Sequence, residues 1–404
     1  MKFRGPRHLV QRRRHGAGWT QSGRSLAPGP FAGLILADNG ASVTRVDKPS
    51  TSSPDILCRG KRSIAISPKV PSGLETLRKL IIASDVLIEP FRPGVMERLG
   101  LGPEVFLGDG NKPGLNEKLI YARIVGFPRT GPHKNMAGHD INYLALSGVL
   151  SMLPGPPDKP SFPGNILADF AGGGLIGALG IMLAIQELAK TGKGKVVNID
   201  MVSGVRYISS FPLLAAMDPS DSTFGKARGT NVLDGGAPFY NVYTCKDGRW
   251  MSVGCIEPQF FVIFLSKFLQ ALPVGFALDG WRPELDIQGD RSQWDKLKAF
   301  LEKGFMTDTR DYWAKVYEGS DACTLPVLSR EEAADLDASH SPVPVPHPLL
   351  KAPTTALPNP ETIQPGSHTH EILSELGLNE KEIVQLAADG ALGDDIKFPV
   401  RTKL

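Results

Sequence analysis

Between residues 31 and 203 the sequence alternates apolar runs that are typical of buried strands with segments that are typical of helices. The expected strands are ASVTRVD (41–47), RSIAIS (62–67), DVLIE (85–89), KLIYARIVGF (118–127) and VVNIDMV (196–202). Helices are expected over 31–38, 72–83 and about 169–190. Strands that are separated by helices form a parallel sheet with helices on both faces. The alternation therefore predicts an α/β fold.

The pattern lacks its first strand. A sheet of this kind opens with a strand before the helix expected at 31–38, and the preceding residues offer only HLV (8–10) as a β-like run. We therefore expect the first strand to be absent or replaced.

The character of the sequence changes near residue 225. APFYNVYT (237–244) and RWMSVG (249–254) flank the turn Lys246-Asp247-Gly248, which predicts an antiparallel hairpin. A helix-rich stretch follows, and a chain of 404 residues is long for one core, so two domains are expected. The expected ranges are 1–25 for an atypical basic segment, 26–203 for a large domain, 204–224 for a linker, 225–335 for a small α+β domain, and 336–404 for a proline-rich return linker with two helices that rejoin the large domain.

Composition excludes several classes of function. A net charge of +3 is too small to indicate nucleic-acid binding. The four cysteines contain no CxxC pair, which favours a reducing compartment and argues against structural zinc. The longest apolar run, 172–185, is too short and too rich in glycine to span a bilayer. The absence of GxGxxG, Walker and GxSxG motifs removes the commonest nucleotide-binding and hydrolase interpretations.

Both ends of the chain carry features of targeting signals. Residues 1–37 contain no acidic residue and several arginines, a composition typical of a mitochondrial presequence and equally of a disordered basic tail. The last residues, Thr402-Lys403-Leu404, resemble the peroxisomal signal SKL. We therefore expect a peroxisomal or mitochondrial location, and otherwise a cytoplasmic one.

Two ionisable residues stand where helices are expected to begin. His139 precedes apolar residues at helical spacing in AGHDINYLALSG (137–148), and Asp169 precedes three glycines in NILADFAGGG (165–174). Ordinary helix caps would explain both residues, and for each stretch alone this is the simpler interpretation. Consecutive glycines weaken a helix, however, and at its start they let a ligand or another backbone approach exposed N–H groups. Together the two stretches suggest a site that moves protons and stabilises an oxyanion.

Cations cluster in CRGKRS (58–63) and in PFRPGVMERLG (90–100). These clusters contain Arg59, Lys61, Arg62, Arg92 and Arg98. Such clusters suit a polyanionic phosphate ligand, although isolated charge runs are more often solvated loops.

Ten stretches resemble, in the same order, the α-methylacyl-CoA racemases of the CoA-transferase family III superfamily. They are LAPGPFAGLILADNGASVTRVDKP, RGKRS, DVLIEPFRPGVMERLGLGP, LIYARIVGF, AGHDINYLALSGVL, NILADFAGGG, TGKGKVVNIDMV, NVLDGGAPFYNVY, VGCIEPQF and SDACTLPVL. The resemblance runs from about Leu26 to Pro326, with weaker similarity to Gly377. It implies a Rossmann-like large CoA-binding domain, a small α+β domain and an interlocked homodimer. The active site would lie between the large domain of one chain and the small domain of the other.

The resemblance also implies an isomerase that interconverts (2R)- and (2S)-2-methylacyl-CoA thioesters, in the metabolism of branched-chain fatty acids or bile-acid-type side chains. One residue removes the α-proton, an enolate forms, and a second residue returns a proton to the opposite face. His139 and Asp169 match these two residues. Glu257 matches the partner of the aspartate, and Asp140 matches the neighbour that tunes the histidine. CoA is part of the substrate, and neither a cofactor nor a metal is implied.

For CoA binding, the resemblance implies contacts from the large domain. The matching residues are Lys48, Ile66, Ser67, Lys69, Arg92, Arg98, Gly138, Ile141, Asn142 and Tyr143. Lys48 stands where arginine is usual in the family, so a bidentate phosphate contact there would become a single-point one.

Two other interpretations stay open. A CoA-transferase of the same fold would use Asp169 as a nucleophile and form an acyl anhydride. Those enzymes usually carry a glycine-rich loop where this chain has EPQFF (257–261), and they lack a histidine at the position of His139. An inactive CoA-binding or dimerising variant is the other interpretation, because family members begin with a strand resembling GLRVIELSG and this chain has an unrelated segment there.

Overall fold

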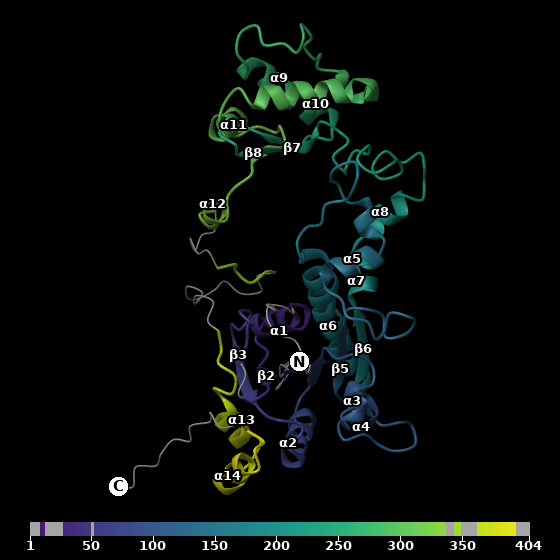
Figure 1. The fold of residues 1–404 in the computed structure, drawn as a ribbon, viewed down its shortest axis with the longest axis vertical. Coiled ribbons are helices and arrows are strands. Elements are labelled where there is room, and N and C mark those ends of the chain that lie inside the picture. The colour runs from purple at the N-terminus through teal and green to yellow at the C-terminus, as the bar shows by residue number, and fades with distance from the viewer. Residues whose placement is uncertain (1–8, 13–26, 50–51, 337–342, 349–361, 393–404) are drawn as a thin grey trace, which may run out of the picture. The chain divides into compact units, whose positions relative to one another are not determined.

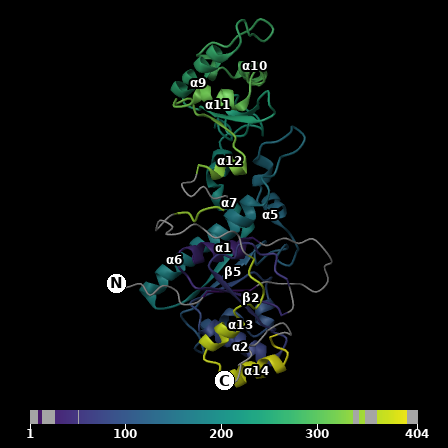
Figure 2. The same ribbon diagram turned by 90° about the vertical axis from the view of Figure 1, so that its left-hand side faces the viewer.

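The computed structural model describes residues 9–12, 27–49, 52–336, 343–348 and 362–392. The chain divides into two compact units, whose elements are labelled in Figure 1 and seen from the side in Figure 2. Unit 1 comprises Met1–Ser147, Pro163–Ile208 and Val343–Leu404, and unit 2 comprises Gly148–Phe162 and Ser209–Pro342. The ranges expected from sequence place 148–162 in the large domain and 204–224 in a linker, whereas this division assigns 148–162 and 209–224 to unit 2 and 204–208 to unit 1.

The two targeting features are not tested by this structure. Thr402-Lys403-Leu404 lies outside the described residues, as does most of the basic N-terminal segment. The location of the protein therefore stays a prediction, which deletion of the last three residues and imaging of the truncated protein would test.

Unit 1 is built on a six-stranded sheet. Its strands are β1 (Leu9–Arg12), β2 (Val43–Asp47), β3 (Lys61–Ala65), β4 (Val86–Glu89), β5 (Ile120–Val125) and β6 (Lys195–Asp200). They lie in the order β3-β2-β1-β4-β5-β6, and every neighbouring pair is parallel. This is the strand order of the Rossmann fold. The α/β prediction is confirmed.

The expectation that the first strand is absent is wrong. β1 lies at the centre of the sheet, where Leu9 pairs with Val43 of β2 and with Val86 of β4. A gap at this position would leave the facing backbone N–H and C=O groups of β2 and β4 unpaired. LVQR (9–12) fills the gap because pairing on both sides outweighs its weak intrinsic β propensity. The interpretation as an inactive variant loses the observation on which it rested.

Helices cover both faces of this sheet. They are α1 (Pro28–Asp38), α2 (Pro71–Ile82), α3 (Val95–Arg98), α4 (Pro103–Leu107), α5 (Asp140–Leu146), α6 (Ile176–Thr191), α7 (Met201–Ile208), α13 (Thr369–Glu375) and α14 (Glu380–Ala388). Alternate strand residues point to opposite faces. Leu87 and Tyr121 share one hydrophobic core with α2, α13 and α14, which lie together in Figure 1. On the other face Ile124 contacts α6 at Gly177.

The helix expected over about 169–190 begins earlier and opens as a π-helix. The π-helix covers Ile166–Leu175 and continues directly into α6. A Cβ atom on Gly172 would lie 2.8 Å from the backbone nitrogen of Val205, and one on Gly204 of α7 would lie 2.0 Å from the Gly172 carbonyl oxygen. The glycines therefore let another backbone approach, which is one of the two explanations expected from sequence.

Among the described residues, one helix is long and apolar enough to cross a membrane. It is the combined helix Ile166–Thr191, of 26 residues, which extends beyond the apolar run at 172–185 at both ends. In its most apolar window 44% of the residues are buried within the protein. The opposite side of the helix exposes Leu175, Leu179, Met182 and Leu183.

Unit 2 contains a three-stranded antiparallel sheet in the order β7-β8-β9. Its elements are β7 (Tyr240–Thr244), β8 (Trp250–Gly254), β9 (Thr324–Pro326), α8 (Ser210–Ala215), α9 (Pro258–Ala271), α10 (Trp294–Phe305), α11 (Arg310–Tyr317) and α12 (Arg330–Ala334). The hairpin of β7 and β8 is confirmed, whereas β9 was not expected. Aromatic side chains fill the core, with the rings of Phe268 and Trp313 stacked at 4.9 Å.

Candidate active site

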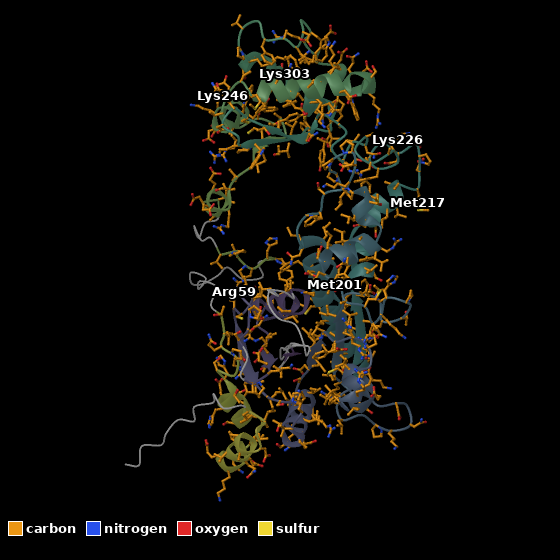
Figure 3. All side chains as sticks on the ribbon, in the orientation of Figure 1. Arg59, Met201, Met217, Lys226, Lys246 and Lys303 are labelled. Carbon is orange, nitrogen blue, oxygen red and sulfur yellow. The ribbon has the colours of Figure 1, made fainter. Side chains whose placement is uncertain are left out.

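A cavity of about 230 Å³ lies beside the carboxyl ends of β4 and β5. Its lining residues come from the start of α1, the end of β5, the segments that follow β4 and β5, the loop before α5, and α5 itself. Met201, which is labelled in Figure 3, completes the lining. The strand order reverses between β1 and β4, and sheets of this type bind ligands in the crevice outside the carboxyl ends at such a point. The cavity is therefore the candidate ligand site of unit 1.

Tyr143 of α5 forms one wall of this cavity. Its ring meets Phe127 edge to face at 4.9 Å, and its hydroxyl donates to the Gly138 carbonyl. A Cβ atom on Gly126 would lie 2.1 Å from Cζ of Tyr143, so the chain after β5 has room only for glycine. Burial raises the pKa of Tyr143 to about 12. Tyr143 thus anchors the loop that leads into His139.

His139 stands immediately before α5 in an extended conformation. Its backbone N–H donates to Oδ1 of Asn142 at 3.1 Å, while the residue itself is exposed. The neighbouring Asp140 is 3% exposed, and its Oδ2 accepts from the backbone N–H groups of Ala168 and Asp169, each at 2.8 Å. The start of α5 is thus tied to the start of the π-helix. The predicted effect of Asp140 on His139 stays a prediction, and the structure adds this second contact.

The same contact corrects part of the expected chemistry. The sequence suggested that a ligand or another backbone could approach exposed N–H groups at the start of this glycine-rich helix, where the N–H groups of Ala168 and Asp169 lie. They are instead bound by the Asp140 carboxylate. These two groups are therefore not donors for an oxyanion.

Asp169 is 7% exposed, in the first turn of the π-helix. Burial raises its pKa to about 6, the hydrogen bond from Asn165 lowers it, the charge of Asp140 raises it and His139 lowers it. The Asn165 amide reaches Oδ2 of Asp169 at 3.3 Å. Because His139 acts electrostatically on this carboxyl group, the structure brings the two predicted acid/base residues together. A carboxyl group with a pKa near 6 can both hold and release a proton near neutral pH.

Three of the predicted CoA-binding residues line the cavity, namely Arg92, Gly138 and Tyr143. Lys48 and Lys69 follow the carboxyl ends of β2 and β3 instead. Because parallel strands end at a common edge of the sheet, these two lysines lie along the same edge as the cavity.

The remaining predicted CoA-binding residues lie elsewhere. Arg98 ends α3, and Ile141 and Asn142 occupy the first turn of α5. The side chain of Ile66 is 1% exposed and belongs to the hydrophobic core, so it is not available to a ligand. The Ser67 N–H donates to the Ala391 carbonyl at 2.8 Å. The Ile66 side chain therefore packs in the core instead of contacting CoA. The Ser67 N–H is likewise used by the C-terminal segment instead of CoA.

The cations of CRGKRS bind the protein itself. Arg59, which is labelled in Figure 3, forms paired hydrogen bonds with Asp38 at 2.7 and 2.6 Å, and Nζ of Lys61 donates to the Pro30 carbonyl. Arg62 pairs with Glu371 and Glu375 of α13. The expectation of a phosphate-binding cluster is wrong for Arg59 and Arg62, because carboxylates distant in sequence neutralise them, and the Lys61 ammonium is bound by a backbone carbonyl.

Glu257 lies in unit 2, immediately before α9, and is exposed. The contact predicted between Glu257 and Asp169 would join the two units and stays a prediction. Among the described residues, no group of three or more His, Cys, Asp or Glu side chains is placed to hold a metal ion.

Sequence reasoning missed two polar residues of this site. Lys134 lines the cavity, as Arg92 does, and Asn165 donates a hydrogen bond to Asp169. Asn165 stands four residues before Asp169, a spacing that places side chains on one helix face, so this contact had a detectable signal. Lys134 lies in a loop whose sequence carries no comparable signal.

Comparison with known proteins identifies similar chains. Residues 22–362 match the family model described as CoA-transferase family III. Alpha-methylacyl-CoA racemase of Mus musculus is 43% identical over 382 residues, covering 92% of this chain and 95% of the mouse protein. Alpha-methylacyl-CoA racemase of Homo sapiens is 44% identical over 383 residues, covering 90% of this chain and 94% of the human protein. The crystal structure of a CAIB/BAIF family protein from Brucella suis superposes with a TM-score of 0.68 at 23% identity, covering 92% of this chain and 98% of that one.

Proposed function

The chain belongs to CoA-transferase family III, and from this premise we propose that it is a racemase that interconverts (2R)- and (2S)-2-methylacyl-CoA thioesters. Identities of 43% and 44% to the mouse and human racemases support this activity. The structural observation that carries the proposal is the buried Asp169, whose pKa lies near 6 and responds to His139.

The proposed reaction needs two proton-transfer groups. The α-hydrogen of a thioester is weakly acidic, so a positioned base must remove it and a positioned acid must return a proton to the other face of the enolate. Asp169 acts as base for one enantiomer and His139 for the other, and each serves as the acid in the reverse direction. A group with a pKa near 6 suits both tasks, since neither protonation state is rare near neutral pH.

We further propose that the phosphates of CoA bind along the carboxyl edge of the unit 1 sheet. Arg92 and Lys134 line the cavity, and Lys48 and Lys69 follow neighbouring strands. Cations along one edge suit a ligand with several phosphate groups. Glu257 is assigned to the same reaction as the partner of Asp169, an assignment that rests on the resemblance alone.

An interlocked homodimer is proposed on the exposed apolar side of the Ile166–Thr191 helix. Leu175, Leu179, Met182 and Leu183 are each about half exposed, as a contact face would be before assembly. Sedimentation equilibrium should give twice the chain mass of 43.5 kDa, and Leu179→Glu should lower that mass by placing a charge in the contact. A wild-type particle of 43.5 kDa would contradict the dimer.

The proposed activity is tested by hydrogen exchange. A single enantiomer of a 2-methylacyl-CoA, incubated with the protein in D₂O and EDTA, should lose its optical purity and gain one deuterium at the α-carbon. Mass spectrometry and chiral analysis of the released acid measure both changes. A folded sample that leaves the α-hydrogen in place would contradict the racemase, whereas hydroxylamine trapping of an acyl group on Asp169 would favour the transferase.

A further inference from the structure

A buried network of charged side chains lies next to the unit 1 cavity, and the proposed reaction gives it no role. Glu89 ends β4 and is 0% exposed, and its Oε1 accepts from Nε of Arg123 on β5 at 2.8 Å. Nη2 of Arg123 also pairs with Glu97 of α3. Nη1 of Arg129 lies 3.5 Å from the same Oε1 of Glu89. The network therefore joins two carboxylates and two guanidinium groups near the carboxyl ends of β4 and β5.

This network binds both backbone polar groups of Phe91. The Phe91 N–H donates to Oε2 of Glu89 at 2.8 Å, and Nη1 of Arg129 donates to the Phe91 carbonyl at 3.2 Å. The residues on either side of Phe91, Pro90 and Arg92, line the cavity. The position of this wall is therefore fixed by two side chains that do not belong to the lining.

Stability is a weak explanation for burying the Glu89 carboxylate. Burial raises the pKa of Glu89, while the hydrogen bonds from Arg123 and from the Phe91 N–H lower it. The net rise means that these partners do not fully offset the loss of hydration. Apolar residues in place of a buried ion pair often preserve or increase stability, whereas a buried pair can fix one geometry. The geometry fixed here is that of the segment that carries Arg92.

Arg92 presents its charge at the cavity. The residue is exposed and belongs to the lining. Burial and the charge of Asp169 raise the pKa of Tyr143, whereas the charge of Arg92 lowers it. The guanidinium is thus close enough to the Tyr143 wall to act on it, and it is accessible to an anionic ligand.

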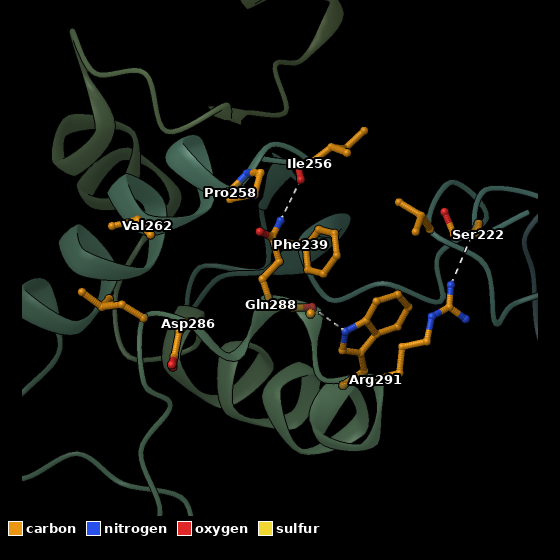
Figure 4. Close-up of a pocket in the computed structure, with 12 residues that line it drawn as sticks. Ser222, Phe239, Ile256, Pro258, Val262, Asp286, Gln288 and Arg291 are labelled. Atoms are coloured by element: carbon orange, nitrogen blue, oxygen red, sulfur yellow. Dashed lines mark hydrogen bonds between the residues drawn. The ribbon is translucent and has the colours of Figure 1, made fainter.

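The larger cavity of unit 2, of about 690 Å³, differs in this respect (Figure 4). Its Arg291 guanidinium lies 4.6 Å from the Trp294 ring centre and donates to the Ser222 carbonyl at 3.3 Å. Asp286 adds a carboxylate to the lining. A cation that the protein already binds and a nearby negative charge both disfavour a phosphate ligand. The phosphates of CoA are therefore assigned to unit 1.

We infer that Glu89 and Arg129 are positioning residues for CoA binding, which hold the Phe91 backbone so that Arg92 meets a phosphate group. This inference rests on the proposed function, in which Arg92 binds CoA. Without the two hydrogen bonds, the segment between β4 and α3 would adopt other conformations, and the guanidinium would reach the phosphate in a smaller fraction of molecules. Affinity for CoA would fall although no direct contact had been removed.

The test measures the affinity of free CoA by calorimetry, without turnover. Arg92→Ala should lose about tenfold, since it removes a charge-assisted contact. Glu89→Ala should also lose about tenfold, and the double variant should bind no more weakly than Arg92→Ala alone, because the side chain to be positioned is gone. Losses that multiply to about a hundredfold in the double variant would overturn the inference.

Arg129 provides a milder test from the other side of Phe91, because its side chain is only half-buried. Arg129→Ala should lose about fivefold in CoA affinity. Arg129→Lys should lose less than about twofold, because an ammonium group can still donate to the Phe91 carbonyl. The cycle of Arg129→Ala with Arg92→Ala decides the question if Glu89→Ala does not fold. Glu75→Ala removes an exposed, ion-paired carboxylate from α2 and is the control, which should bind CoA as the wild type does.

Pantetheine separates positioning from collapse of the cavity. It is the part of CoA without nucleotide or phosphates, so its affinity, from NMR titration, should change by less than about twofold in Glu89→Ala and Arg129→Ala. Equal losses for pantetheine and CoA would overturn the inference, as would unchanged CoA affinity in both variants or a wild type that does not bind CoA. The expected losses in a protein that leaves the α-hydrogen in place would uphold the inference and refute the racemase.

Discussion

Asp169→Asn is expected to abolish racemisation and, at pH 7.5, to make the protein more stable. Racemisation should fall by about a thousandfold, because a positioned acid or base contributes about 10²–10⁴ to a rate. His139 remains, so deuterium should still enter one enantiomer, without inversion. Chiral analysis and mass spectrometry of the same samples separate the two events. Equal loss of exchange from both enantiomers would contradict the division of labour between the two residues.

The gain in stability follows from the raised pKa. Asp169 has an ordinary value of 3.8 and a folded value of about 6, so the folded state prefers the protonated carboxyl group. Its favourable contribution is complete below pH 3.8 and is lost as the pH rises through 6. Above that value the buried carboxylate destabilises the fold by about 3 kcal/mol at most, at about 1.4 kcal/mol for each pH unit of difference.

Asparagine preserves the shape of Asp169 without the charge, and its oxygen can still accept from Asn165. The free energy of unfolding should therefore rise by up to about 3 kcal/mol at pH 7.5 and by less than about 1 kcal/mol at pH 4. Urea unfolding at both pH values and equal protein concentration measures the difference. Asp158→Asn, at an exposed position, is the control and should change neither value. A gain that is independent of pH would contradict the electrostatic origin.

The sheet was largely predictable because its signals are local. Each of β2 to β6 overlaps an apolar run bounded by turn or helix signals, and burial on both faces requires such runs. For β1 the only local signal was the three-residue run HLV (8–10). The position of β1 is determined by its pairing with β2 and β4. These strands are distant in sequence, so the residues around 9–12 carry no information about the pairing.

The sequence proposes residues for the site but does not predict how they are connected. His139 and Asp169 stand out because each adjoins a helix start. The contact that joins those starts, from Asp140 to the N–H groups of residues 168 and 169, links distant segments and has no local signal. The same limit explains the wrong expectation for Arg62, whose partners in α13 lie at the other end of the chain. A charged residue can be recognised in the local sequence, whereas the residue with which it pairs is determined by the tertiary fold.

Asp140→Ala should be the most destabilising single change at the site. It removes the acceptor of two buried N–H groups, those of Ala168 and Asp169, and each unsatisfied group costs about 1–3 kcal/mol. The free energy of unfolding should therefore fall by about 2–6 kcal/mol. Racemisation should fall by about a hundredfold, because misplacing a reacting group by an ångström has an effect of that size. Urea unfolding and chiral analysis measure the two losses.

Asp140→Asn separates position from charge. The asparagine oxygen can accept from the same two N–H groups, so stability and maximal racemisation should stay near the wild-type values. The charge of Asp140 raises the pKa of Asp169, and its removal lets Asp169 remain ionised at lower pH. The acid side of the pH–rate profile should therefore move to lower pH, a change that a purely structural role would not produce. If the pH–rate profile is unchanged in Asp140→Asn and racemisation is lost only in Asp140→Ala, then Asp140 has a structural role alone, which is to hold the two helix starts together.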